Sequence, residues 1–277
     1  MGKKQHRGTV YRGERLERVA FPLGGLGAGM ICLEGTGALS HVSLRHRPEI
    51  FNEPLVFAAL HVKGARPARL LEGPVPRWKI AHPWGSGFGG AGNGLGGKDY
   101  GLPRFSSCRF QARFPFGRVE LRDAAMPVRA AICGWSPFLP GNADDSGLPV
   151  AALEYSFRNP ARRPRDCVFS FHAANFMRLA GLKPEEESAR VRPLEGGVLL
   201  EQPAVEGLPA SAGVFAAWVP DGGAVSDCAW FRGKWFDTLT TLWGHVAAGD
   251  VVSRPPHAVG KPGGGGSIYL PFRLPPG

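Results

Sequence analysis

The chain has 277 residues, of which 43% are hydrophobic, and its 33 lysines and arginines outnumber its 23 aspartates and glutamates to give a formal net charge of +10. No run of 18 apolar residues occurs, which excludes a membrane-spanning helix, and the basic N-terminus leads into charged residues, unlike the apolar stretch of a secretory signal. The arginines are scattered without a block of five or six, so we expect a solvated basic surface and no nucleic-acid partner.

The cysteines indicate a reducing compartment. They are odd in number, widely separated and form no C-x-x-C pair, so neither a zinc site nor a redox pair is indicated. Each lies in or beside an apolar stretch, which predicts buried free thiols and a cytoplasmic protein. The five are Cys32, Cys108, Cys133, Cys167 and Cys228.

The first distinctive feature along the chain is a glycine-rich apolar run from Phe21 to Gly29, whose last six positions hold four glycines. Glycines this dense indicate backbone packed against backbone, or φ values that a Cβ would forbid. Gly25, Gly27 and Gly29 have the spacing G-x-G-x-G, which differs from the dinucleotide fingerprint G-x-G-x-x-G. We therefore expect a glycine-rich bend between two strands.

A second glycine-rich segment resembles a phosphate-binding loop only in part. Gly92 to Lys98 satisfy G-x-x-x-x-G-K, but Asp99 occupies the position of the Ser or Thr that ligates magnesium. The segment is expected to be a flexible loop. The eight histidines show no metal-ligand spacing, so we expect no metal and no cofactor.

Most of the chain alternates between apolar and polar residues with a period of two, which is typical of half-buried strands. In the first such hairpin the arginines at 109, 113, 118 and 122 occupy the solvent-facing positions. Many short strands with Gly and Pro turns predict an all-β protein, a large antiparallel β-sandwich. Predicted strands lie at 108–114, 118–122, 151–157, 167–172 and 268–274, with strands covered on both faces at 56–60 and 213–219 and one helical turn at 184–188.

The loop after residue 135 is rich in oxygen-bearing side chains. Asn142, Asp144, Asp145 and Ser146 lie between two prolines, and three interpretations stay open. Asx side chains build turns by themselves, carboxylates bind calcium, and such a loop can shape a sugar site in a neighbouring domain.

Several stretches resemble, in the same order, the opening of glycoside hydrolase family 116, the bacterial β-glucosidases and non-lysosomal glucosylceramidases. The resemblance implies that residues 21–277 are that family's N-terminal β-sandwich domain, preceded by a basic segment at 1–20. It also implies that the catalytic Glu and Asp belong to a later helical-barrel domain to which nothing here corresponds. The stretches are 21–54, 135–142, 145–149, 155–159, 235–238 and 242–243.

The resemblance implies two partners: the helical-barrel domain, in the same polypeptide or a separate one, and the parent protein's β-glucoside or glycolipid substrate. Candidates for substrate or interdomain contacts are Trp135, Asp144, Asp145, Trp235 and Trp243. The family's next strand would lie beyond residue 277, so we expect an incomplete domain with an unpaired strand edge.

The carboxylates offer no catalytic pair. Retaining glycosidases need two carboxyl groups about 5–5.5 Å apart. Glu49 and Glu53 are four residues apart, and Asp144 and Asp145 are adjacent in a loop. We assign no catalytic residue. Two alternatives stay open: a stand-alone carbohydrate-binding module, and a basic protein that binds anionic polymers.

Overall fold

The structure, a computed structural model, describes residues 8–45, 47–50, 52–65, 67–80, 99–179, 188–220, 222–231, 237–258 and 263–277. Within these residues the named strands pair with one another in antiparallel fashion throughout. The prediction of an antiparallel all-β protein is confirmed.

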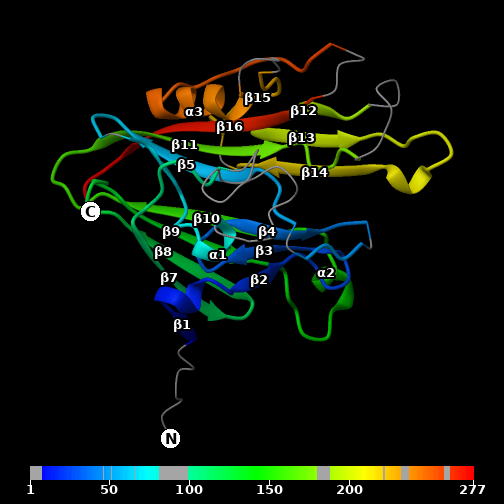
Figure 1. Cartoon of the computed structure of the whole chain (residues 1–277), viewed down its shortest axis with the longest axis horizontal. Helices are drawn as coiled ribbons and strands as arrows, with labels where there is room; N and C mark the ends of the chain where they lie inside the picture. Colours follow the sequence, from blue (N-terminus) through cyan, green and yellow to red (C-terminus); the bar gives the residue numbers. More distant parts are fainter. Residues whose placement is uncertain are drawn as a thin grey trace, which may run out of the picture. The chain divides into compact units, whose positions relative to one another are not determined.

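The strands divide between two compact units, each with one five-stranded and one three-stranded sheet (Figure 1). The described part of the chain thus forms four sheets where one sandwich would have two. The second unit's long strand follows a turn bounded by Pro160 and Pro164, which lack the amide hydrogen that a continuing ladder needs. The first unit comprises residues 1–53, 71–80 and 104–160, and the second comprises 54–70, 81–103 and 161–277.

The first unit's larger sheet has the order β1-β7-β8-β9-β10. Phe110, Val119 and Ile132 on its inner face are fully buried, while arginines occupy the outer face, as the alternation predicts. The segment before residue 21 contributes the edge strand β1. The strands are β1 (Thr9–Tyr11), β7 (Ser107–Arg113), β8 (Phe116–Arg122), β9 (Arg129–Trp135) and β10 (Ala152–Arg158).

The first unit's smaller sheet packs on that inner face. A Cβ added at Gly134 would lie 2.9 Å from Leu33 Cδ2 and 3.1 Å from Leu23 Cδ1, so the glycine permits the close approach. The sheet contains β2 (Ala20–Leu23), β3 (Met30–Glu34) and β4 (Leu39–Ser43), and the unit's short helices are η1 (Gly13–Leu16), α1 (Arg77–Ile80) and α2 (Ala143–Ser146).

The second unit contains four of the strands that alternation or apolar runs predict, β5, β11, β14 and β16. Its larger sheet has the order β15-β16-β11-β5-β6, and its smaller sheet β12-β13-β14. The strands are β5 (Val56–Val62), β6 (Arg69–Leu70), β11 (Arg165–Ala174), β12 (Arg190–Leu194), β13 (Gly197–Gln202), β14 (Gly213–Trp218), β15 (Val225–Asp227) and β16 (Gly265–Leu274).

Two expectations about the second unit's strands need correction. The strand predicted at 213–219 is not covered on both faces: Val214 is 58% and Trp218 54% exposed, so the face of β14 that carries both side chains is open to solvent. The strand at 268–274 is not simply an edge, since β15 pairs with Ser267–Tyr269 on the side opposite β11.

The second unit also holds a helix that the period-two analysis missed, α3 (Thr238–Ala248). Its ends carry recognisable signals, since the Asp237 carboxylate caps the first turn and Gly249 adopts a left-handed φ of 76° after the last. Leu242 on this helix packs into the apolar cluster of Phe57 and Trp230. The helical turn predicted at 184–188 falls almost wholly outside the described residues. A further short helix is η3 (Pro209–Ser211).

His172 on β11 lies at the centre of a polar network in this core. The imidazole is fully buried between two serine hydroxyls, with Nδ1 2.8 Å from Ser267 Oγ and Nε2 2.8 Å from Ser170 Oγ. The Trp230 indole donates to the same Ser267 oxygen at 2.8 Å. Burial lowers the pKa of His172 to about 3, so the ring is neutral in the folded protein at physiological pH.

This burial predicts an acid sensitivity. Unfolded histidine binds a proton near pH 6.5, while folded His172 does so only near 3, so its contribution to stability is present above 6.5 and is lost as the pH falls. The free energy of unfolding should fall by up to about 1.4 kcal/mol per pH unit in this window. The free energy of unfolding, measured by urea titration at several pH values between 7 and 4.5, should fall less steeply with decreasing pH for His172→Gln than for the unmodified chain. Equal slopes would contradict the prediction.

Candidate functional site

The glycine-rich run between β2 and β3 meets the loop that follows β9. The Gly24 amide donates to Ser136 Oγ at 2.7 Å, and the Leu26 amide donates to the Ser146 carbonyl at 2.8 Å. Both segments carried the family resemblance, although more than 100 residues separate them in the chain. We call this contact the interlock.

Glycine is required at the interlock for two separate reasons. A Cβ at Gly25 would lie 2.1 Å from the Leu148 carbonyl oxygen, so the two backbones can touch only without a side chain there. Gly29 has a φ of +94°, which L side chains rarely adopt. The expected glycine-rich bend between two strands is confirmed, and backbone-to-backbone packing is its physical basis.

The loop is shaped by its own side chains. Asn142 caps α2: its Oδ1 accepts from the Asp145 amide at 3.0 Å and its Nδ2 donates to Asp145 Oδ2 at 2.6 Å. The buried Ser146 hydroxyl accepts from the Leu139 amide at 3.0 Å and donates to the Leu139 carbonyl at 3.1 Å. The turn-forming interpretation is therefore observed. Asp144 and Asp145 lie exposed on the short helix.

Replacing Ser146 with alanine should loosen this loop. The substitution leaves the Leu139 amide without its partner, while the Leu139 carbonyl keeps only the bond from the Asn142 amide, so the free energy of unfolding should fall by about 1–2 kcal/mol. Urea titration followed by circular dichroism measures the change. Ser156→Ala, on the exposed face of β10, is the matched control and should shift stability by less than about 0.5 kcal/mol. Equal effects of the two variants would show that the Ser146 bonds contribute nothing.

Exposed aromatic side chains gather where the β7–β8 hairpin approaches this loop. Phe114 is 60% exposed and meets Phe138 edge to face, with ring centroids 4.9 Å apart. Half-buried Trp135 lies beside Phe116, with centroids 6.4 Å apart, and its indole donates to Glu154 Oε1 at 3.0 Å. We call Phe114, Phe116, Trp135, Phe138 and Leu139 the aromatic end. Exposed apolar groups in such numbers are typical of surfaces that bind a protein or a sugar ring.

The other two tryptophan candidates are not part of this site. Trp243 lies on α3 in the second unit, where it is partly buried and packs against the apolar cluster of Ala59, Ala68 and Val246. Trp235 falls outside the described residues. Of the predicted set, Trp135 is the last residue of β9, and Asp144 and Asp145 lie on α2 in the loop that follows it.

A buried charged cluster in the first unit escaped the sequence analysis. Lys79 Nζ lies 2.6 Å and 2.7 Å from the two carboxylate oxygens of Glu34 and 2.5 Å from Glu53 Oε1. Burial by itself lowers the pKa of Lys79, but the charges and hydrogen bonds of the two glutamates outweigh it and raise the pKa above its usual value. Lys79 lies 45 positions after Glu34 and 26 after Glu53, and no local pattern connects them.

This cluster does not supply the chemistry of a glycosidase. Both carboxylates share one ammonium group and are largely shielded from solvent, with side-chain exposures of 10% for Glu34 and 15% for Glu53. Neither is a free nucleophile or a proton donor, the two roles that glycoside hydrolysis requires. Glu49 instead pairs with the Arg47 guanidinium at 3.2 Å. The arrangement is that of a structural ion triad.

Metal and thiol chemistry find little support in the part of the chain that the structure describes. These residues contain no group of three His, Cys, Asp or Glu side chains that could hold a metal ion, and their five cysteines are free. Cys32, Cys167 and Cys228 are buried as predicted, whereas Cys108 and Cys133 are half-buried. Burial raises the pKa of the Cys32 thiol to about 11. Residues 92–98, the partial phosphate-loop match, fall outside the described residues.

These features define an antiparallel all-β protein with an interlocked glycine run and loop and an exposed aromatic end. The sequence model of the family described as beta-glucosidase 2, glycosyl-hydrolase family 116 N-term matches residues 20–277. The chain therefore belongs to the N-terminal domain family of glycoside hydrolase family 116. The match begins at the first residue of β2 and extends through β16, so it includes both units. None of the curated proteins matched the chain. Among the described residues, no helix is both long and apolar enough to cross a membrane.

Proposed function

We propose that this chain is the non-catalytic N-terminal domain of a retaining β-glycosidase that acts on β-glucosides or glucosylceramide-like glycolipids. The observation that carries the proposal is the family match over residues 20–277. It is supported by the buried carboxylates of Glu34 and Glu53, which are both engaged in ion pairs with Lys79. Catalysis then belongs to a helical-barrel domain, in the same polypeptide or in a separate one.

The aromatic end is the surface that we assign to docking of that barrel domain. Phe114 and Phe138 expose apolar area that association would remove from water. The interlock holds the neighbouring loop in one conformation, so the surface is formed before the partner binds and little conformational entropy is lost. We assign Asp144 and Asp145, which are exposed on the same loop, to the entrance of a sugar site on the partner.

The proposal extends to the organisation and location of the domain. The two compact units together make up the single N-terminal domain expected for residues 21–277, since one family match extends over residues of both. The free cysteines support a cytoplasmic location.

The first test is catalysis by the isolated chain. Purified 1–277 should release no product from an aryl β-glucoside above the rate of a blank. Hydrolysis that is abolished by Glu49→Gln or Asp145→Asn would refute the assignment. Quenching of Trp135 fluorescence by sugars, without hydrolysis, would favour the alternative of a stand-alone carbohydrate-binding module, because this indole lies in the aromatic end.

The second test begins with sequencing the DNA that follows the codon for Gly277. An open frame that encodes a helical barrel allows the docking surface to be examined in the complete enzyme. Replacing Phe114 and Phe138 with serine should then lower glucosidase activity by about tenfold or more. The control pair Val214→Ser and Trp218→Ser removes equally exposed apolar groups from the second unit and should have little effect. Equal losses in both pairs would refute docking at the aromatic end.

A further inference from the structure

Arginine dominates the outer face of the sheet β1-β7-β8-β9-β10. Strand register places Arg109 opposite Glu120, Ser107 opposite Arg122, and Arg129 opposite Arg158. Adjacent strands lie about 4.8 Å apart, so these side chains form a continuous basic surface. The sequence predicted solvent-exposed arginines, and the strand register shows that they lie together on one face of the sheet. The outward arginines are Arg12, Arg109, Arg113, Arg118, Arg122, Arg129 and Arg158, and the outward carboxylates are Glu120 and Glu154.

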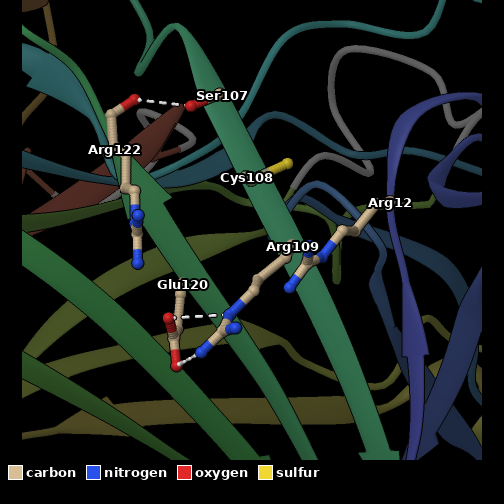
Figure 2. Close-up of a pocket in the computed structure, with 6 residues that line it drawn as sticks. All are labelled: Arg12, Ser107, Cys108, Arg109, Glu120 and Arg122. Atoms are coloured by element: carbon tan, nitrogen blue, oxygen red, sulfur yellow. Dashed lines mark hydrogen bonds and ion pairs between the residues drawn. The ribbon is translucent and has the colours of Figure 1, made fainter.

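A pocket of about 200 Å³ opens on this face (Figure 2). Within it Arg109 forms a bidentate pair with Glu120 at 2.8 Å and 2.7 Å, and the Ser107 hydroxyl donates to the Arg122 carbonyl at 3.3 Å. The pocket is lined by Arg12, Ser107, Cys108, Arg109, Glu120 and Arg122.

The charges of this pocket do not cancel. The negative charge of the Glu120 carboxylate is balanced by Arg109. Hydrogen bonds from Arg109 lower the pKa of Glu120, and the charges of Arg109, Arg118 and Arg122 add to this effect although partial burial opposes it. Arg12 and Arg122 have no ion pair with any carboxylate of the described residues, so two positive charges remain uncompensated. A dianion would neutralise them, whereas a single carboxylate would leave half of the excess.

We propose that this pocket binds a phosphate group, either inorganic phosphate or the terminal phosphate of a monoester. A phosphate monoester is largely dianionic at neutral pH because its second pKa lies near 6, and inorganic phosphate is present there as both monoanion and dianion. Guanidinium groups bind phosphate oxygens in a bidentate manner, and the pocket is smaller than the roughly 300–1,000 Å³ of sites for whole organic ligands. Arg12 precedes the family match at residue 20, so the pocket is completed by a segment outside the matched domain.

The experiment uses the purified chain with inorganic phosphate as the probe, by calorimetry and thermal unfolding. Phosphate should raise the melting temperature, and Arg12→Gln with Arg122→Gln should weaken binding about tenfold or more. The control pair Arg77→Gln and Arg273→Gln removes the same charge from exposed positions elsewhere and should leave affinity within about twofold. Glu120→Gln should tighten binding about fivefold, because it removes a negative charge from the lining of the pocket.

A second arm identifies the source of the phosphate. Sedimentation with phosphatidylcholine vesicles, with and without about 20 mol % phosphatidic acid, tests a lipid headgroup. Binding of free phosphate, or binding of vesicles only when they contain phosphatidic acid, supports the proposal on one condition. The double variant Arg12→Gln and Arg122→Gln must lose this binding, and the control variant Arg77→Gln and Arg273→Gln must keep it. Equal losses in the two pairs, no binding to either probe, or weaker binding by Glu120→Gln would overturn it.

Discussion

Replacing Lys79 with methionine should destabilise the first unit by about 3–5 kcal/mol. The substitution leaves Glu34 and Glu53 facing one another in a largely buried site without the ammonium group that both contact. Two unpaired carboxylates then bear a desolvation cost as well as mutual repulsion. Urea unfolding at pH 7, followed by circular dichroism, measures the loss.

Two controls separate the ion triad from the loss of a long side chain. Lys63→Met changes an exposed lysine and should alter stability by less than about 0.5 kcal/mol. Adding Glu34→Gln and Glu53→Gln to Lys79→Met should restore most of the lost stability, since a buried ion cluster replaced as a whole costs little. A loss below about 1 kcal/mol for Lys79→Met alone, or no recovery in the triple variant, would show that the triad is not the source of stability.

Gly25→Ala should destabilise the chain by about 3 kcal/mol and open the interlock. The new methyl group would lie 2.1 Å from the Leu148 carbonyl oxygen, so one of the two backbones must move. The Leu26 amide, which donates to the Ser146 carbonyl, then loses protection. Hydrogen exchange of this amide, measured beside urea unfolding, should accelerate along with the loss of stability.

Gly27→Ala is the matched control for this clash. Gly27 lies in the same run, but a Cβ there meets nothing within 4 Å, so only its φ of +77° opposes alanine. That conformation costs an L residue about 1–2 kcal/mol and leaves the contact with Leu148 intact. If Gly27→Ala matched Gly25→Ala in both stability and exchange of the Leu26 amide, backbone conformation alone would explain the glycines, and the steric account would be wrong.

The secondary structure was largely predictable because strand alternation is a local property. The apolar and polar positions of 108–122 determine which face of the hairpin is buried, and Phe110 and Val119 are accordingly buried. Two features of the secondary structure were predicted wrongly, the helix α3 and the two covered faces of the strand at 213–219. α3 was missed because a period of two does not detect a helix, whose sequence signals here are the cap Asp237 and the terminal Gly249. The strand at 213–219 was assigned two covered faces because apolar composition does not reveal whether another layer packs on each face of the strand.

The candidate site was predictable in its parts. The glycine run and the loop around Asn142 were each identified by residue type, and Asx turn chemistry is local enough to foresee. Their contact was not foreseeable, because the hydrogen bond from Gly24 to Ser136 joins residues 112 positions apart. The aromatic end likewise depends on the meeting of Phe114 and Phe138, which come from different segments.

The sequence by itself determined the antiparallel all-β class, most strand positions and the family, because these follow from local periodicity and from motifs in a fixed order. Only the tertiary structure decided that the described strands form four sheets in two units, and that Lys79 meets Glu34 and Glu53. It also decided that Arg12, Arg109 and Arg122 line one pocket. Such contacts depend on strand order and register, which long-range packing selects and local composition does not encode.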